Sequence, residues 1–189
     1  MLPVLRVLFD ALHHGLQNEP EVFSRVRMFF VGTDYAPPEG VRYQVLPLVR
    51  EMGLEDIVSE HPSRVPYLDA LQILLDSDML VVVGSTEAHY TASKIFPYIL
   101  ADRPLFGIFH EDSSAVRILR ATAAAEVVTF NRQSPPTEKV PEIYTILRRL
   151  LTTLGQPRCV RWEAFEPYTT RVLTGRLAQA FEAALAKGN

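Results

Sequence analysis

The residues best suited to chemistry gather between Gly84 and Tyr98, where an apolar run is followed by a loop rich in hydroxyl groups. A helix that begins near Thr91 would present unpaired backbone N–H groups and the positive end of its dipole in its first turn. The hydroxyl of Ser93 and the ammonium of Lys94 would lie beside them. This combination suits a phosphate or diphosphate. Alternatively, Thr91 only caps the helix and Lys94 is a solvated surface charge, and the spacing alone does not decide between the two.

Polar side chains also follow the other apolar runs of the chain. In open α/β sheets, ligands bind outside the carboxyl ends of the strands. The groups that follow the five predicted strands are Gly32, Thr33 and Asp34; Glu60, His61 and Arg64; Gly84, Ser85, Thr86, Glu87 and His89; His110, Glu111, Asp112 and Ser113; and Asn131 and Arg132. We therefore predict the site at this edge. Glu87 could accept hydrogen bonds from sugar hydroxyls, or it could be an exposed loop carboxylate.

Three histidines at this edge, His61, His89 and His110, raise the question of a metal site. Imidazole is a common zinc ligand, but no pair of them has H-x-x-x-H spacing. We therefore expect one histidine to donate a hydrogen bond to a substrate, and we predict no metal. The sequence also contains no G-x-S-x-G around its serines, no G-x-G-x-x-G and no Walker loop.

The elements that must position these residues alternate between short apolar runs and helical stripes. Strands are predicted at 27–32, 57–60, 78–84, 104–109 and 126–130, and helices at 2–16, 45–52, 67–75, 91–101, 113–123, 137–153 and 168–186. Continuous apolar strands between helices are typical of a parallel sheet that is covered on both faces. The pattern therefore predicts a doubly wound, Rossmann-like α/β fold. Because the chain begins with a helix, either the first strand lies upstream in a longer protein or the fold has an additional helix before its first strand.

Composition narrows the class of protein. The 189 residues fit a single domain, and 19 Lys and Arg against 22 Asp and Glu give a net charge of −3, which argues against nucleic-acid binding. Cys159 is the only cysteine, which excludes an internal disulfide and indicates a reducing, cytoplasmic compartment. No apolar run reaches the roughly 18 residues of a membrane span.

Several runs, densest between residues 64 and 110, resemble a known family. They are Arg64-Val-Pro-Tyr-Leu-Asp-Ala-Leu, Asp78-Met-Leu-Val-Val-Val-Gly-Ser-Thr-Glu87, Thr91-Ala-Ser-Lys-Ile-Phe-Pro-Tyr-Ile-Leu-Ala101, Arg103-Pro-Leu and His110. Together they are similar to the C-terminal half of a family 4-type glycosyltransferase with the GT-B fold. The resemblance implies that this half binds a nucleotide-diphosphate sugar and that a separate N-terminal domain binds the sugar or glycan acceptor. It also implies retaining, metal-independent transfer with no cofactor beyond the donor substrate.

The resemblance further implies roles for single residues. Lys94 and Glu87 are assigned the catalytic roles, with Lys94 and the helix start stabilising the departing diphosphate. The residues assigned to donor binding are Gly32, Thr33, Glu60, His61, Arg64, Tyr67, Ser85, Thr86, Tyr90, Thr91, Ser93 and His110. Three features depart from the family pattern. Pro97 stands where the family often has a second glutamate that holds the ribose. The family's first strand of this domain, with a basic pair nearby, would precede Met1. The acceptor domain would also precede Met1.

Two other functions stay open at this point. One is a sugar-nucleotide epimerase of GT-B type, and the other is a non-enzymatic α/β interaction module. Without an acceptor domain, the chain by itself is not expected to catalyse transfer. The last helix carries an apolar stripe of Leu173, Leu177, Phe181 and Leu185, which would either cross to an N-terminal domain, as in GT-B proteins, or pack on this sheet.

Overall fold

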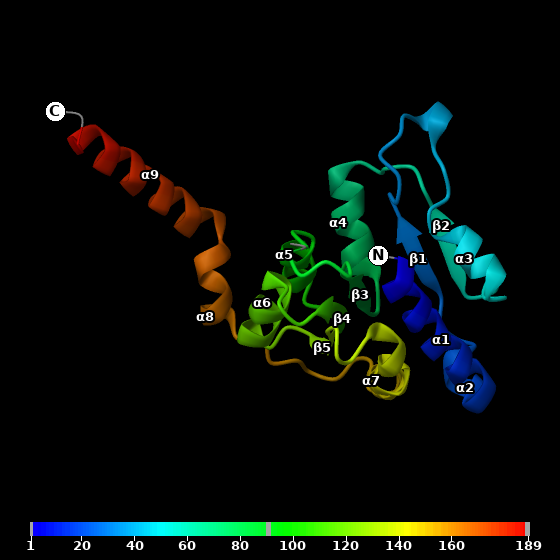
Figure 1. Cartoon of the computed structure of the whole chain (residues 1–189). Coiled ribbons are helices and arrows are strands. Elements are labelled where there is room, and N and C mark those ends of the chain that lie inside the picture. The colour runs from blue at the N-terminus through cyan, green and yellow to red at the C-terminus, as the bar shows by residue number, and fades with distance from the viewer. Residues whose placement is uncertain (1, 90–91, 188–189) are drawn as a thin grey trace.

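The computed structural model of the chain describes residues 2–89 and 92–187, in which strands and helices alternate (Figure 1). The strands are β1 (Met28–Val31), β2 (Val58–His61), β3 (Leu80–Val83), β4 (Leu105–His110) and β5 (Glu126–Phe130). The helices are α1 (Leu2–Asn18), α2 (Pro20–Phe23), α3 (Leu46–Glu51), α4 (Tyr67–Asp76), α5 (Ile95–Leu100), α6 (Ser114–Thr122), α7 (Val140–Thr152), α8 (Trp162–Phe165) and α9 (Thr170–Lys187), with 3₁₀ turns at Pro38–Gly40, Pro136–Lys139 and Glu166–Tyr168.

All strand pairs in the described residues are parallel, which confirms the predicted α/β class with parallel strands. Each strand lies within two residues of its predicted position. The strands form two small sheets rather than one, with the orders β1-β2 and β3-β4-β5. The short apolar runs therefore predicted the strands, whereas the division between β1 and β3 had no signal in the sequence.

Strand β4 lies at the centre of the larger sheet, and its residues Leu105 to Phe109 are all buried. Its side chains alternate between two cores, since Phe106 and Ile108 belong to the cluster that includes α1 and α7, while Leu105 and Phe109 pack with α5 and α6. Gly84 follows β3 against this strand, and a Cβ atom there would lie 2.6 Å from a ring carbon of Phe109. Close packing therefore requires a glycine at the carboxyl end of β3.

Helix α5 begins later than predicted. The sequence suggested a start near Thr91, but the helix begins at Ile95, with Lys94 directly before it. Proline lacks an N–H group and clashes with the preceding turn in a helix interior, so it is tolerated only in the first turn. Pro97 is the third residue of the observed helix, whereas a start at Thr91 would have placed it inside. The predicted anion site on the first helical turn after Thr91 is therefore corrected: Ala92, Ser93 and Lys94 precede the helix, and α5 has only six residues.

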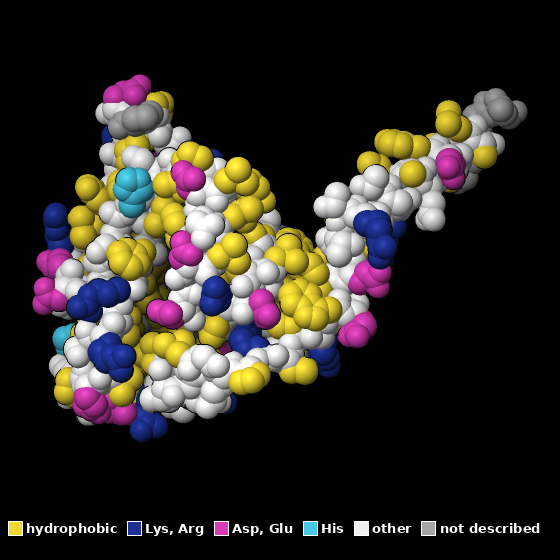
Figure 2. Space-filling view, turned by 180° about the vertical axis from the view of Figure 1, so that it is seen from behind, with side chains coloured by type: hydrophobic (Ala, Val, Ile, Leu, Met, Phe, Trp, Pro, Cys, Tyr) yellow, Lys and Arg dark blue, Asp and Glu magenta, His cyan; other side chains and the backbone are white. Residues whose placement is uncertain are grey.

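Helix α9 extends away from the body of the molecule (Figures 1 and 2). Its apolar stripe is exposed, from 49% of Leu173 to 75% of Leu185. The alternative that this helix packs on the sheet is therefore wrong. None of the helices in the described residues is long and apolar enough to cross a membrane.

Candidate functional site

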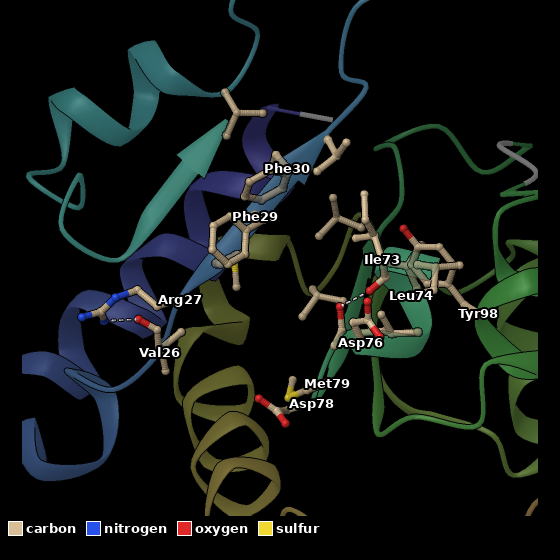
Figure 3. A pocket seen from close by; sticks show the side chains of 18 of the residues that line it. Val26, Arg27, Phe29, Phe30, Ile73, Leu74, Asp76, Asp78, Met79 and Tyr98 are labelled. Atoms are coloured by element: carbon tan, nitrogen blue, oxygen red, sulfur yellow. Dashed lines mark hydrogen bonds between the residues drawn. The ribbon is translucent and has the colours of Figure 1, made fainter. Parts of the chain in front are cut away.

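A cleft of about 1740 Å³ opens between the two sheets (Figure 3). Residues of β1 and β3 form its walls, together with one face of α4, while Leu5, Leu12 and Leu147 reach it from α1 and α7. Most of its lining is apolar. The volume exceeds the roughly 300–1,000 Å³ of a typical small-molecule pocket.

Predicted site residues from three segments line one cleft. They are Gly32 and Thr33 after β1, Arg64 between β2 and α4, Tyr67 at the start of α4, and Lys94 directly before α5. These segments all follow the carboxyl ends of strands. Residues far apart in the sequence thus line one cleft, and we call the set of Gly32, Thr33, Arg64, Tyr67 and Lys94 the mouth of the cleft.

Gly32 turns the chain directly after β1. Its φ of +69° lies in the left-handed region that favours glycine. Its N–H donates to the carbonyl of His61 at 2.9 Å, and a Cβ atom there would lie 3.7 Å from the Cα atom of Arg64. Gly32 therefore lets the two loops that follow β1 and β2 approach each other at the mouth.

Glu60 organises the loop beside the mouth, although it does not itself line the cleft. Its carboxylate accepts hydrogen bonds from the Thr33 hydroxyl and from the N–H groups of Gln44 (2.9 Å), Val45 (2.9 Å) and Leu46 (2.7 Å), the last of which begins α3. Desolvation, the largest influence, raises the pKa of Glu60, but the hydrogen bonds together outweigh it and hold the pKa below its usual value. These contacts fix Thr33 and the start of α3.

Arg64 is held at the mouth by an aromatic ring. Its guanidinium carbon lies 4.3 Å from the centroid of the Tyr35 ring, a cation–π contact. Tyr35 lies in a loop that Asp34 ties together, because the Asp34 carboxylate accepts from the N–H groups of Tyr35 (2.7 Å) and Arg42 (2.7 Å). The hydrogen bond from Arg42, followed by that from Ala36, lowers the pKa of Asp34.

Lys94, directly before α5, and Tyr98, within α5, both line the cleft. Lys94 is exposed and makes no ion pair with any residue in the described ranges. Tyr98 lines the cleft in Figure 3, and burial raises the pKa of its hydroxyl. Sequence reasoning missed Tyr98 and Tyr35. The spacing of four residues from Lys94 could have found Tyr98, because residues at i and i+4 share a helix face.

The other predicted site residues lie elsewhere. Those that do not line the cleft are Glu60, His61, Ser85, Thr86, Glu87, Ser93 and His110. The Ser85 hydroxyl accepts from the N–H of Glu87 at 3.2 Å, so it closes its own loop. Tyr90 and Thr91 lie outside the described residues.

His110 pairs with Asp112, with its Nδ1 atom 3.7 Å from a carboxylate oxygen, and its ring packs edge-on against Phe130 at 5.7 Å. Across residues 2–89 and 92–187, no three His, Cys, Asp or Glu side chains are grouped so that they could hold a metal ion.

Comparison with known proteins adds no family to this geometry. No model of a known protein family matches the chain, and no curated protein matches it significantly. A function must therefore be inferred from the residues and the site.

Proposed function

We propose that this chain is the donor-binding domain of a GT-B glycosyltransferase and that the diphosphate of a nucleotide sugar binds at the mouth of the cleft. The observation that carries the proposal is that Arg64 and Lys94 line the same cleft as Gly32 and Thr33. Two cations beside a hydroxyl and a glycine backbone form the polar set that a diphosphate requires. Arg64 comes from β2–α4 and Lys94 from β3–α5, so the anion would lie across the two sheets.

The order of the strands supports the doubly wound form of the fold. Side by side, the two sheets read β2-β1 and β3-β4-β5, so the chain reverses its direction of winding between β1 and β3. Ligands of open α/β sheets bind at this kind of reversal, outside the carboxyl ends of the strands. The mouth of the cleft stands at this point.

In the proposed reaction the bond between the sugar anomeric carbon and the diphosphate oxygen breaks, and a bond to an acceptor hydroxyl oxygen forms. The diphosphate departs with the bonding electrons, and the proton of the acceptor hydroxyl passes to the departing diphosphate oxygen. Arg64 and Lys94 would stabilise the charge that develops on the diphosphate. Tyr67, with 73% of its surface exposed, offers a ring against which a base could stack. The acceptor and its domain are not part of the described chain.

The test is calorimetric titration with UDP, GDP and ADP. We expect one nucleotide to bind, and we expect Lys94→Ala and Arg64→Ala each to weaken it by about 10-fold or more, because each removes a charge-assisted contact. Arg132→Ala is the matched control, since Arg132 is an exposed cation after β5 that does not line the cleft. Absence of binding by all three nucleotides, or equal affinity in the two mouth variants and the control, would contradict the proposal.

A non-enzymatic interaction module is a second candidate, which the exposed stripe of α9 favours. Leu177 and Phe181 are 54% and 62% exposed on a helix that extends from the body. Apolar surface of this kind is typical of protein interfaces. This candidate predicts that no nucleotide binds and that Lys94→Ala changes nothing, so the same titration separates the two.

A further inference from the structure

Helix α5, which Lys94 directly precedes, is held by few backbone hydrogen bonds. The helix has only six residues, and Pro97 within it has no N–H group to donate. The N–H of Tyr98 donates to the Lys94 carbonyl over an N–O distance of 3.4 Å, which exceeds the usual range of about 2.7–3.2 Å. Because short helices depend mainly on packing for their stability, the position of Lys94 must depend on the side chains that surround α5.

The side chains of α5 point in three directions. Lys94 and Tyr98 line the cleft, and the Tyr98 ring lies among its lining residues in Figure 3. Ile95 and Ile99 are buried in the core that β3 and β4 share with α6. Lys94 has helical backbone angles, φ −60° and ψ −19°, so 3.6 residues per turn place Phe96 about 200° around the helix axis from it. Phe96 therefore lies on the side of α5 that faces away from the cleft.

Two aromatic rings from the C-terminal part of the chain pack against Phe96. The ring centroids of Phe96 and Tyr168 lie 5.6 Å apart, and those of Phe96 and Phe165 lie 6.3 Å apart. Phe165 and Tyr168 also contact each other, with 6.4 Å between their centroids. All three distances lie in the range of about 4.5–7 Å in which aromatic pairs attract each other. These three residues, which we call the aromatic cluster, cover the side of α5 opposite the cleft.

The segment that leads into the aromatic cluster is fixed to both α5 and α6. The backbone N–H of Arg161 donates to the Thr122 carbonyl at 2.8 Å, and its guanidinium donates to the Arg120 carbonyl at 2.7 Å, both at the C-terminal end of α6. The guanidinium of Arg158 donates to the carbonyl of Arg103, which follows α5. Helix α8 in turn lies beside α6 (Figure 1). The two C-terminal rings are therefore held against α5 from an anchored position.

We propose that Phe165 and Tyr168 are positioning residues, which act through Phe96 to hold Lys94 at the mouth of the cleft. Lys94 and Phe96 are two residues apart on opposite sides of α5. Loss of a ring behind Phe96 would let the first turn of α5 move into the vacated space and draw Lys94 away from the mouth. The assignment rests on the proposed function, in which Lys94 is one of the two cations that stabilise a diphosphate.

A fixed position matters for the cation. A charge that is already placed where negative charge develops stabilises it without having to reorient, so a displaced Lys94 would contribute less. Neither Phe165 nor Tyr168 lines the cleft, so their effect on a nucleotide must pass through α5. Tyr168 is only partly buried, whereas Phe165 is buried. Tyr168 is therefore the better position for a substitution that removes a ring and keeps the fold.

The first test is calorimetric titration of the full chain with UDP, GDP and ADP. We expect Tyr168→Leu to weaken binding of the preferred nucleotide about 3- to 10-fold, and Tyr168→Phe, which keeps the ring, to stay within about 2-fold of wild type. In a Lys94→Ala background, Tyr168→Leu should cause no further loss, because its effect passes through the Lys94 ammonium. Equal weakening in both backgrounds would overturn the proposal, because a merely structural role would act on either background alike.

The second test needs no nucleotide. Residual dipolar couplings of the N–H groups of α5 report its orientation, with the N–H groups of β4 and β5 as the reference. We expect these couplings to change in Tyr168→Leu, and in Phe165→Leu as a second variant, but not in Tyr168→Phe.

Unchanged couplings of α5 in both Leu variants would overturn the proposal, and so would a reorientation of α5 that leaves the nucleotide affinity unchanged. Reorientation of α5 in the Leu variants supports it even where the wild-type chain binds no nucleotide, an outcome that contradicts the proposed function alone.

Discussion

Glu60 joins the loop that carries Thr33 to the start of α3, and its replacement tests whether this carboxylate supports the mouth of the cleft. One oxygen accepts from Thr33 and from Gln44, and the other accepts from Val45 and Leu46. Glu60→Ala removes all four acceptor contacts. Glu60→Gln keeps one carbonyl oxygen and turns an NH₂ group toward two donors.

The size of the effect follows from these contacts. A hydrogen bond to a charged group contributes about 1.5–3 kcal/mol, and loss of a helix cap costs about 0.5–2 kcal/mol. The contacts share one carboxylate and are not additive, and Glu60 is only partly buried. We therefore expect Glu60→Ala to lower the free energy of unfolding by about 2–3 kcal/mol and Glu60→Gln by about 1–2 kcal/mol. For a chain of this length, the larger change lowers Tm by about 4–12 °C.

The assay is urea unfolding followed by circular dichroism across pH. Because the pKa of Glu60 is lower in the folded than in the unfolded protein, its contribution is present above the unfolded pKa of about 4.3 and is lost as the pH falls through the folded pKa. The difference between wild type and Glu60→Gln should therefore shrink in acid. Glu55→Gln, at an exposed carboxylate, should stay within about 0.5 kcal/mol of wild type. A cost at neutral pH no larger than this control, or a difference that does not change with pH, would refute the reasoning.

Two further substitutions, Gly84→Ala with Gly175→Ala as its control and Glu19→Gln, test the packing and the helix contacts. Gly84→Ala would place its Cβ 2.6 Å from a ring carbon of Phe109, and it should cost about 1–3 kcal/mol in thermal unfolding. Gly175→Ala in the exposed α9 should be neutral or slightly stabilising, and a similar loss there would contradict the packing argument. Glu19 accepts hydrogen bonds from Tyr144 and Arg148 of α7, and these hydrogen bonds lower its pKa. Glu19→Gln should destabilise at neutral pH and lose this effect as the pH falls through the folded pKa, whereas a pH-independent urea midpoint difference would contradict the ion pair.

The strands and most helices could be predicted because each depends on residues close in sequence. The run Glu126 to Phe130 is the clearest case, since the predicted and observed strands are identical. The predicted start of α5 was wrong because Thr91 was interpreted as a helix cap. Pro97, six residues later, limits where the helix can begin. A local propensity was thus outweighed by a local steric constraint that was present in the same sequence.

The candidate site could be predicted only in part, because its contacts cross the chain. The rule that ligands bind at strand ends predicted Gly32, Thr33 and Arg64, whereas Lys94 was predicted from the expected helix start; all four line the cleft. No pattern indicates that Glu60 would accept from the N–H of a residue 14 positions earlier, or that an aromatic ring would lie against Arg64. Such pairings depend on how two loops approach each other in space, which periodicity does not encode.

The separation of β1 and β2 from the larger sheet has a consequence for cooperativity. No backbone ladder in the described chain joins the two parts, so β1-β2 is attached through side chains such as those of α1 packed on α7. Strand β4, paired on both sides and buried, should open only in global unfolding, while β1-β2 should open as a separate unit at lower free energy. A ligand that contacts both parts at the mouth would bind only the closed form. By linkage, it would slow exchange in β1-β2 by the factor 1 + L/Kd, where L is the free ligand concentration, and the slowest amides of β4 would still report global stability.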